Sequence, residues 1–245
     1  MKKRALSLLM AGALAAAALS GCGASGSSSA ESTAAASSET TASAADGDTL
    51  SFGVIAPLTG PHALYGEAAK NGVNLALEEI NEAGGVKVGD KSYSLNAAVI
   101  CDDKSDSTEA ISAYNNCASY DILGIIGTYA SSCTKAFATQ AQSDGLIVIT
   151  PQSTNASICK IGDYIFRACF SDDAQGPAMA EFIKDKLGAK KAAIIYGSNE
   201  DYCTGLYESI SKYFDENGVD YVVYECNSTD TDFSAQVSKV VAEGC

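Results

Sequence analysis

The chain has 245 residues, with 30 acidic and 16 basic side chains that give a formal net charge of −14. This acidity argues against nucleic acid as a partner, because binding to a phosphate backbone depends on clustered Lys and Arg. Hydrophobic residues make up 47% of the chain, so most of it can bury a core, and the length suits up to two domains.

The first residues have the composition of an export signal. Three basic residues at 2–4 precede an apolar run over 5–19, which is short for a membrane-spanning helix. The run ends in LSGC at 19–22, which resembles the bacterial lipobox. This resemblance implies a signal peptide at 1–21 and lipidation of Cys22, whereas the alternative is a membrane anchor with an incidental cysteine. Lipid alone would then hold the protein at the outer face of the cytoplasmic membrane.

Residues 22–49 contain the lipidated Cys22 and then mostly Ser, Ala, Thr and Gly. This composition has too little hydrophobicity to fold and predicts a disordered tether.

From residue 50 onward, apolar runs typical of strands alternate with stretches of helical periodicity. In chain order the pattern predicts a strand at 52–56, a helix at 65–80, a hairpin of strands at 86–88 and 92–101, a helix from Asp106 to Ala118, a strand at 122–127, a helix at 132–143, strands at 146–149 and 164–169, a helix at 177–187, a strand at 192–196, a helix at 205–216, a strand at 219–226 and a helix at 232–243.

Short buried strands that alternate with helices predict an α/β fold, with parallel sheets covered by helices on both faces. Right-handed crossovers make the expected architecture doubly wound and Rossmann-like. Asp106 and Glu109 form a predicted capping pair for the helix that follows them. We expect the inner face of that helix to comprise Ala110, Ile111, Tyr114 and Ala118.

In such a fold, ligands bind beyond the carboxyl ends of the strands. Hydroxyl groups collect there, and Ser131 and Ser132 also open a helix, where free N–H groups favour an anion such as a carboxylate. Tyr65 and Tyr202 are candidates for aromatic walls around an apolar part of the ligand. The alternatives are that Ser131 or Ser132 only caps its helix, that Tyr65 belongs to the core, and that Thr154 is a turn residue.

The sequence indicates no catalytic site and no metal site. The nine cysteines include no C-x-x-C pair, and we interpret them as small buried hydrophobes rather than as a disulfide framework. The single histidine, His62, and the acidic pair Asp102 and Asp103 provide too few ligands for a metal. We therefore expect no metal and no cofactor.

Taken together, several segments resemble the leucine/isoleucine/valine-binding protein family. The resemblance spans 51–243 and is carried by IAPLTGPHALYG at 55–66, DDKSD at 102–106, IGTYASS at 126–132, TPQSTN at 150–155, Phe166-Arg167, Gln175-Gly176, Asp201-Tyr202 and TDFS at 231–234.

This resemblance implies a type I periplasmic-binding-protein fold, in which two Rossmann-like lobes close over an amino acid or amide and deliver it to an ABC importer. It implies that Ser131 binds the ligand carboxylate and that Thr154 contacts its main-chain groups. The ligand-binding set is Tyr65, Ser131, Ser132, Gln152, Ser153, Thr154 and Tyr202. The expected lobes are 50–171, including a hinge strand, and 172–245, and we expect a monomer.

Members of that family continue for more than a hundred residues past the position that matches Cys245. The chain is therefore expected to be C-terminally truncated, with an incomplete second lobe that has an exposed apolar sheet edge. A sensor domain of the same fold is the alternative function. An enzyme is not indicated, because the chain contains no G-x-S-x-G or Walker motif and no G-x-G-x-x-G phosphate fingerprint after a predicted strand.

Overall fold

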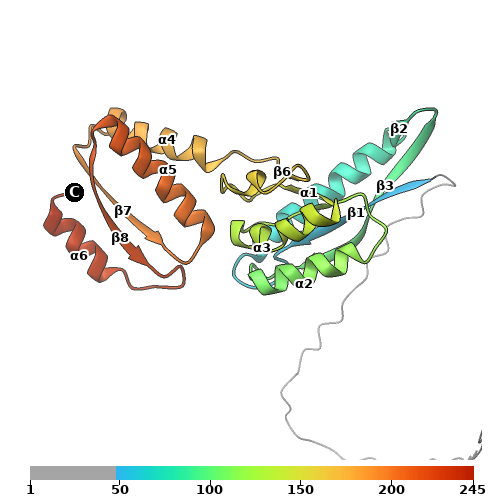
Figure 1. Ribbon diagram of the computed structural model, residues 1–245, viewed down its shortest axis with the longest axis horizontal. Coiled ribbons are helices and arrows are strands. Elements are labelled where there is room, and N and C mark those ends of the chain that lie inside the picture. The colour runs from blue at the N-terminus through green and yellow to red at the C-terminus, as the bar shows by residue number, and fades with distance from the viewer. Residues whose placement is uncertain (1–47) are drawn as a thin grey trace, which may run out of the picture. The chain divides into compact units, whose positions relative to one another are not determined.

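Apolar strands from the first part of the folded chain assemble into a six-stranded sheet, called here the first sheet (Figure 1). The computed structural model describes residues 48–245, so the expected signal peptide, Cys22 and nearly all of the tether lie outside the described residues. The strand order is β2-β3-β1-β4-β5-β6. The strands are β1 (Thr49–Ala56), β2 (Val86–Val88), β3 (Lys91–Asp102), β4 (Gly124–Ile126), β5 (Ile147–Thr150) and β6 (Ile165–Arg167).

Every pairing in the first sheet is parallel except that of β2 with β3. Those two strands form the predicted hairpin, with Val86 opposite Tyr93. β1 lies between β3 and β4. The chain therefore first places β2 and β3 on one side of β1 and then places β4, β5 and β6 on its other side. Such a switch in strand order opens a crevice at the carboxyl ends of the strands, where doubly wound proteins bind ligands.

Helices cover both faces of the first sheet: α1 (Ala63–Glu82) lies on one face, and α2 (Ser107–Ala118) and α3 (Ser131–Asp144) lie on the other (Figure 1). The main core lies under α2 and α3. There the fully buried rings of Tyr114 and Phe137 stack with centroids 5.1 Å apart. Burying one such side chain contributes about 1.5–3 kcal/mol, and the Tyr114 hydroxyl keeps a partner by donating to Asp144 at 2.6 Å.

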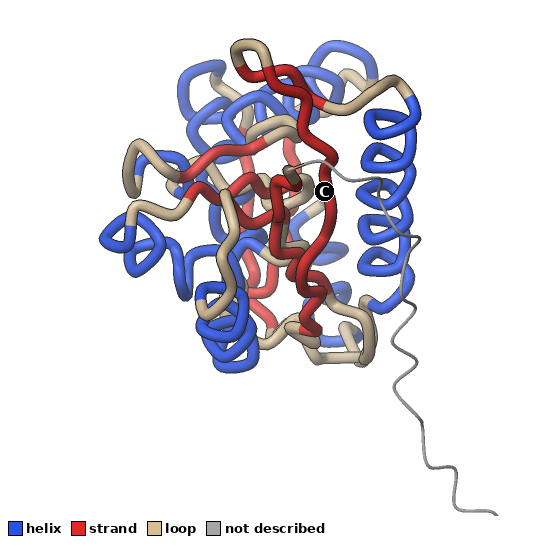
Figure 2. Tube along the Cα trace, turned by 90° about the vertical axis from the view of Figure 1, so that its right-hand side faces the viewer, coloured by secondary structure: helices blue, strands red, loops and turns tan. Residues whose placement is uncertain are grey.

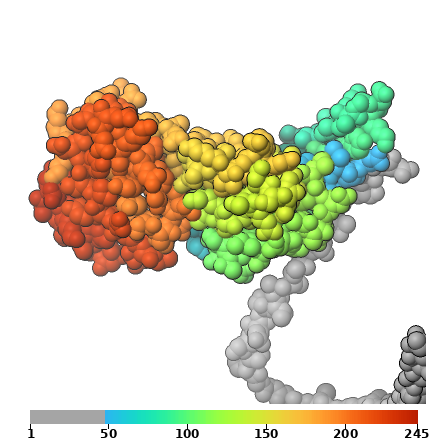
Figure 3. Space-filling model, in the orientation of Figure 1, coloured from blue at the N-terminus to red at the C-terminus, as the bar shows by residue number. Residues whose placement is uncertain are grey.

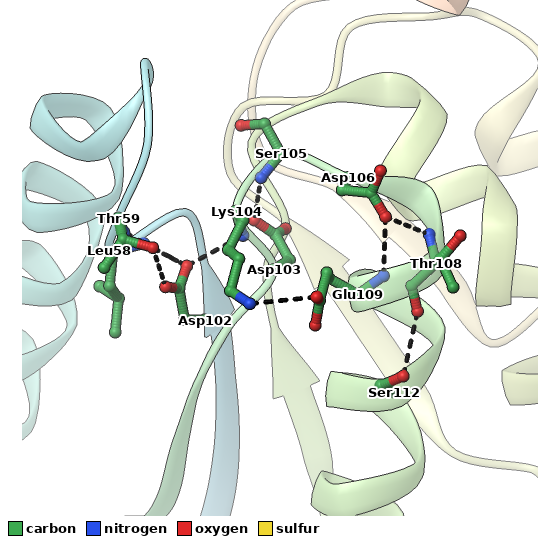
Figure 4. Close-up of polar contacts among 10 residues, drawn as sticks. All are labelled: Leu58, Thr59, Asp102, Asp103, Lys104, Ser105, Asp106, Thr108, Glu109 and Ser112. Atoms are coloured by element: carbon green, nitrogen blue, oxygen red, sulfur yellow. Dashed lines mark hydrogen bonds and ion pairs between the residues drawn. The ribbon is translucent and has the colours of Figure 1, made fainter.

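The N-terminus of α2 is capped as predicted. The Asp106 carboxylate accepts hydrogen bonds from the N–H groups of Thr108 at 2.8 Å and Glu109 at 3.0 Å (Figure 4). The Glu109 carboxylate forms an ion pair with Lys104 at 3.0 Å and so leaves the reciprocal half of a capping box unused.

The predicted inner face of α2 was right for Ala110 and Tyr114 but wrong for Ile111 and Ala118, which are exposed. The buried stripe is instead Ala110, Ala113, Tyr114 and Cys117. This is the i, i+3, i+4, i+7 pattern of one helix face.

The rest of the chain forms a second sheet of two parallel strands, β7 and β8, with its own small core around Ala180, Ile210 and Phe214. Figure 2 shows the strands in red with the helices around them in blue. In Figure 3, the residues between the first sheet's green helices and the orange residues of the second sheet's region are coloured yellow. The elements are α4 (Asp172–Glu181), the π-helix η2 (Phe182–Lys186), β7 (Lys191–Gly197), α5 (Asp201–Asn217), β8 (Asp220–Cys226) and α6 (Ser234–Glu243). A short 3-10 helix, η1 (Ile158–Lys160), precedes β6 and belongs to the first core through Ile158.

Two helix starts differ from the sequence prediction. α4 begins at Asp172 and not at Pro177, because the Ser171 hydroxyl caps it by accepting from the N–H of Asp173 at 3.3 Å. α5 begins at Asp201 and not at Gly205, and an acidic side chain in the first turn suits the helix dipole there. Tyr202 therefore lies in the first turn of α5 rather than in a loop.

Candidate functional site

The loops that follow β4 and β5 are joined by a buried network of hydroxyl groups. The Ser153 hydroxyl is fully buried and lies 2.7 Å from the hydroxyl of Thr134, 3.2 Å from the carbonyl of Thr128 and 3.1 Å from the carbonyl of Tyr129. Thr150 adds a bond from its hydroxyl to the Thr128 carbonyl at 2.8 Å. The side chain of Ser153 thus holds the two loops together.

The N-terminus of α3 follows directly from the β4 loop. Its N-cap is Ala130, which provides no side-chain hydrogen bond, so neither Ser131 nor Ser132 caps this helix and that alternative is wrong. The first bond along the helix runs from the N–H of Thr134 to the Ala130 carbonyl at 3.1 Å. The N–H groups of the three preceding residues therefore lie at the positive end of the helix dipole, a favourable place for an anion.

Ser131 lies at this helix end, with only 2% of its surface exposed. Its hydroxyl accepts a hydrogen bond from the N–H of Asn155 at 3.3 Å, so it also contacts the segment after β5. The Ser132 hydroxyl points toward α5 and donates to Glu200 at 3.3 Å. The two neighbouring serines thus serve different contacts.

Aromatic rings gather beside the loop that follows β1. Tyr65 stacks on Tyr129 with ring centroids 4.6 Å apart, and His62 lies 5.1 Å from Tyr129. Tyr65 is 51% exposed, so the alternative that it belongs to the core is wrong. Burial raises the pKa of Tyr129, and the nearby phenols of Tyr65 and Tyr202 raise it further.

Tyr129 is a residue that the sequence analysis missed. It precedes Ser131 by two residues in the loop after β4, but this position alone does not show that its ring faces Tyr65. Because Tyr129 is close to both Tyr65 and Tyr202, it connects the two predicted tyrosines.

Thr154 lies in a buried polar corner outside any assigned turn. Its carbonyl accepts hydrogen bonds from the N–H of Asp172 at 3.0 Å and from Arg167 at 3.2 Å. The hydroxyl of Thr154 and both carboxylate oxygens of Asp172 are buried without a hydrogen-bond partner among the described residues. Burial raises the pKa of Asp172, against the neighbouring Thr154 hydroxyl and Arg167, which lower it.

Gln152 is half-buried, and its side-chain oxygen has no partner among residues 48–245. It follows Pro151 in the same loop as Ser153, at the carboxyl end of β5. Gln152 therefore adds another unused acceptor to this edge of the sheet.

The start of α5 brings Tyr202 to the same region. The Asp201 carboxylate forms an ion pair with Lys135 of α3, and the Asp201 carbonyl accepts from the Asn155 amide at 2.6 Å. The Tyr202 hydroxyl accepts from Gln175 at 3.2 Å. The loop after β5 and the start of α5 therefore both contact the start of α3. Six of the predicted site residues lie on these three segments, and Tyr65 lies in the first turn of α1, where it stacks on Tyr129.

Other features of the described residues do not add a competing polar site. A hollow of about 450 Å³ between α1 and the first sheet is lined by apolar side chains such as Val73, Leu77 and Ile126. A second hollow, also of about 450 Å³, lies around Phe170 and Met179. Within residues 48–245, three potential metal ligands do not cluster anywhere, and no helix combines the length and hydrophobicity needed to span a membrane.

The loop after β1 is held in place from β3. The Asp102 carboxylate accepts hydrogen bonds from the N–H groups of Leu58 at 2.8 Å and Thr59 at 3.3 Å, and from the Thr59 hydroxyl (Figure 4). Burial acts to raise the pKa of Asp102, but the hydrogen bonds from Thr59, Lys104 and Leu58 outweigh it and lower the pKa. Asp102 thus has a structural role, because it fixes the loop that leads into Tyr65.

Comparison with known proteins agrees with this geometry. A family model described as "Periplasmic binding protein" matches residues 49–245. A leucine-, isoleucine-, valine-, threonine- and alanine-binding protein of Pseudomonas aeruginosa is 31% identical over 199 residues, which are 80% of this chain and 52% of that protein. A Leu/Ile/Val-binding protein homologue of Brucella melitensis is 32% identical over 205 residues, which are 83% of this chain and 54% of that protein.

Solved structures give the same result. The leucine-binding protein LivK of Thermotoga maritima superposes with a TM-score of 0.72 at 31% identity, over 80% of this chain and 54% of that one. The branched-chain amino acid transporter substrate-binding protein LivJ of Streptococcus pneumoniae, solved with isoleucine, gives 0.69 at 30% identity, over 79% and 54%. This chain spans about half the length of the curated relatives it matches.

The predicted fold class is therefore confirmed, and the family consists of extracytoplasmic solute-binding proteins. From the strand order of the first sheet, the polar rim at its carboxyl edge and the match over 49–245, we conclude that the chain belongs to the type I periplasmic binding protein family.

Proposed function

We propose that this protein captures an amino acid of branched-chain or other aliphatic type and delivers it to an ABC importer. The observation that carries the proposal is the N-terminus of α3, which has no side-chain cap and carries the buried hydroxyl of Ser131. The names of the Pseudomonas and Brucella relatives support the ligand class.

In this proposal the ligand carboxylate binds at the start of α3. The N–H groups that precede the first helical bond donate to it, and the Ser131 hydroxyl adds a further donor. The unpartnered hydroxyl of Thr154 is available to a main-chain group of the ligand. These neutral donors hold an anion without any residue that transfers a proton.

The apolar side chain of the ligand contacts the tyrosines. Tyr65 and Tyr129 form a stacked pair, half exposed at Tyr65, and Tyr202 approaches from α5. Aromatic walls with a few placed polar groups are typical of small-molecule sites. We propose that Gln152 and the backbone of Ser153 complete the first-sheet side of the site.

Binding is coupled to closure. The ligand first meets the residues of the first sheet, and the α5 side then adds Tyr202, so the closed form is favoured by contacts that exist only when the site is shut. The ion pair between Lys135 and Asp201 and the bond from Ser132 to Glu200 join α3 to α5 and support this arrangement.

We infer that the protein acts as a monomer and is not an enzyme. The Ser131 hydroxyl bonds a backbone N–H, and the Ser153 hydroxyl bonds carbonyls and another hydroxyl. Neither is paired with a base in the manner of an activated nucleophile.

Calorimetric titration with leucine and with leucinol tests the binding proposal. Leucinol keeps the side chain and the amine but lacks the carboxylate. We expect saturable binding of leucine, isoleucine or valine, and a loss of affinity of at least about tenfold for the matching alcohol, because charge-assisted hydrogen bonds contribute about 1.5–3 kcal/mol. Equal affinity for acid and alcohol would contradict the proposed carboxylate site.

We also propose that Cys22 carries a lipid that anchors the protein outside the cytoplasmic membrane. In cells, the wild-type protein should stay in the membrane fraction after a high-salt wash, whereas Cys22→Ala should not acquire the lipid. Metabolic labelling with a fatty acid reads out the modification directly. Equal labelling of wild type and variant would refute lipidation at Cys22.

A further inference from the structure

Eight cysteines lie within residues 48–245, and all eight are free thiols. Two of them, Cys101 at the end of β3 and Cys117 near the end of α2, lie with their sulfur atoms 3.7 Å apart. Cys117 is fully buried, and Cys101 is 7% exposed. The pair lies within the main core under α2.

The surrounding residues hold the two sulfur atoms together. A Cβ placed on Gly53 of β1 would lie only 3.1 Å from the Cys117 sulfur, so Cys117 fits closely against the sheet at a position without a side chain. The Cys117 thiol donates its proton toward the Cys101 sulfur, and the Asn116 amide donates to the same sulfur at 3.3 Å. The two thiols therefore have distinct roles, one as a donor and one as an acceptor.

We propose that Cys101 and Cys117 form a reversible disulfide site that joins β3 to α2 when the protein meets a low-molecular-weight disulfide. Cys101 is the attacking residue because its sulfur receives two hydrogen bonds, which favour the thiolate there. Cys117 is the resolving residue because its sulfur already lies beside that of Cys101.

The pKa values agree with this assignment. The hydrogen bond from Cys117 and the smaller contribution of Asn116 lower the pKa of Cys101 to about 7, against burial, which raises it. The bond to Cys101 and burial together raise the pKa of Cys117. Within the pair, the thiolate, which is the reactive form, is therefore favoured at Cys101.

The exchange proceeds in two balanced steps. The Cys101 thiolate attacks one sulfur of the small disulfide, forms a mixed disulfide and expels one small thiolate. Cys117 then loses its proton to that thiolate and attacks the Cys101 sulfur, which breaks the mixed disulfide and releases the second small thiolate. The two protein thiols are oxidised to one disulfide, and the small disulfide is reduced to two thiols.

The bond would fix the strand end that precedes Asp102. Because Asp102 holds the loop at Leu58 and Thr59, the cross-link ties α2 to the segment that leads into α1. A disulfide that closes a loop of this size stabilises a protein by an amount that corresponds to a rise in melting temperature of about 5–10 °C.

Peptide mapping of the full chain tests the proposal. The reduced protein is incubated under native conditions with mixtures of oxidised and reduced glutathione, and free thiols are then alkylated. Trypsin releases Cys101 in the peptide 92–104 and places Cys117 with Cys133 in the peptide 105–135. Chymotrypsin, which cleaves after Tyr120, separates those two cysteines, so each linkage can be assigned.

Cys133→Ala is a matched control for Cys117→Ala, because both cysteines lie in helices and both are fully buried. We expect a link between Cys101 and Cys117 as the main intramolecular disulfide in wild type and in Cys133→Ala. In Cys117→Ala that link should be absent, and Cys101 should accumulate as the glutathione adduct.

The wild-type map decides the question even if Cys117→Ala fails to fold. Recovery of Cys101 and Cys117 in alkylated form after native oxidation would overturn the proposal. A different cysteine pair as the main intramolecular disulfide would also overturn it. A rise in the melting temperature on oxidation, reversed by a reductant, is the second supporting result.

Discussion

The hydroxyl of Ser131 accepts a hydrogen bond from the backbone N–H of Asn155 at 3.3 Å, and this contact joins the start of α3 to the loop that follows β5. Two strand ends of the first sheet are thereby fixed around one helix N-terminus. In the proposed site, a ligand carboxylate would meet donors from the helix and from a side chain that is already in place, so that little ordering would be required on binding.

Ser131→Ala should weaken amino-acid binding by about 10- to 100-fold, since a hydrogen bond to a charged group contributes about 1.5–3 kcal/mol. The unliganded protein should also lose about 1–3 kcal/mol of stability, because the buried N–H of Asn155 loses its acceptor. Calorimetry and thermal unfolding provide the two readouts. Ser143→Ala, at the exposed far end of the same helix, is the matched control and should leave affinity unchanged; an equal loss in both variants would contradict the assigned role.

Tyr65→Ala should lower affinity by about threefold to tenfold, because an aromatic pair contributes about 0.5–1.5 kcal/mol beyond its buried area. Tyr65→Phe keeps the ring that stacks on Tyr129 and should bind nearly as tightly as wild type. Titration with isoleucine measures both variants. If Phe and Ala weaken binding equally, the ring itself is not the contact.

Asp102→Ala should destabilise the protein and also weaken binding. It removes the acceptor for the backbone N–H groups of Leu58 and Thr59, which hold the loop before Tyr65, and an intramolecular hydrogen bond of this kind contributes about 0.5–1.5 kcal/mol. Asp106→Ala, which removes only a helix cap, should cost about 1 kcal/mol and leave affinity intact. Denaturant unfolding and calorimetry on both variants separate the two effects.

Asp103 should make stability depend on pH. Burial raises its pKa in the folded chain to about 6, against the N–H of Ser105, which lowers it, and the ordinary value is 3.8. The folded state therefore binds more protons than the unfolded state between those two values, and the free energy of unfolding rises as the pH falls from about 7 to about 4.

Two pKa units correspond to about 2–3 kcal/mol, and Asp103→Asn should lose that gain in denaturant titrations across the range. Asp106→Asn is the control, because the pKa of Asp106 is shifted in the opposite direction from that of Asp103. The hydrogen bonds from Glu109 and Thr108 lower the pKa of Asp106, so that carboxylate loses its contribution to stability as the pH falls. A wild-type profile that Asp103→Asn leaves unchanged would contradict the assignment.

The order of strands and helices could be predicted because strands and helices differ in the periodicity of their apolar residues. The end of α3 could be predicted because Gly145 is a glycine, and its φ of 68° is indeed left-handed. The helix starts of α4 and α5 could not be predicted from apolar spacing. Their first turns carry polar residues, such as Asp172 and Asp201, which periodicity does not register.

The candidate site was predictable in part for a related reason. Strand ends of a parallel sheet meet at one edge, so Ser131 and Thr154 could be placed together from sequence alone. The stacking partner of Tyr65 could not, because nothing in the spacing of Tyr129 distinguishes a loop aromatic that faces the site from one that faces the solvent. The proximity of Cys101 and Cys117 was equally hidden, since it depends on how α2 packs against β3.

The backbone amides at the start of α3 provide the most direct test of the central claim. In ¹⁵N-labelled protein titrated with isoleucine, the amide signals of Ser131, Ser132 and Cys133 should shift saturably and more than those of any other helix start. Saturable binding with these three amides unmoved, and shifts confined to other segments, would contradict a carboxylate site at this helix end.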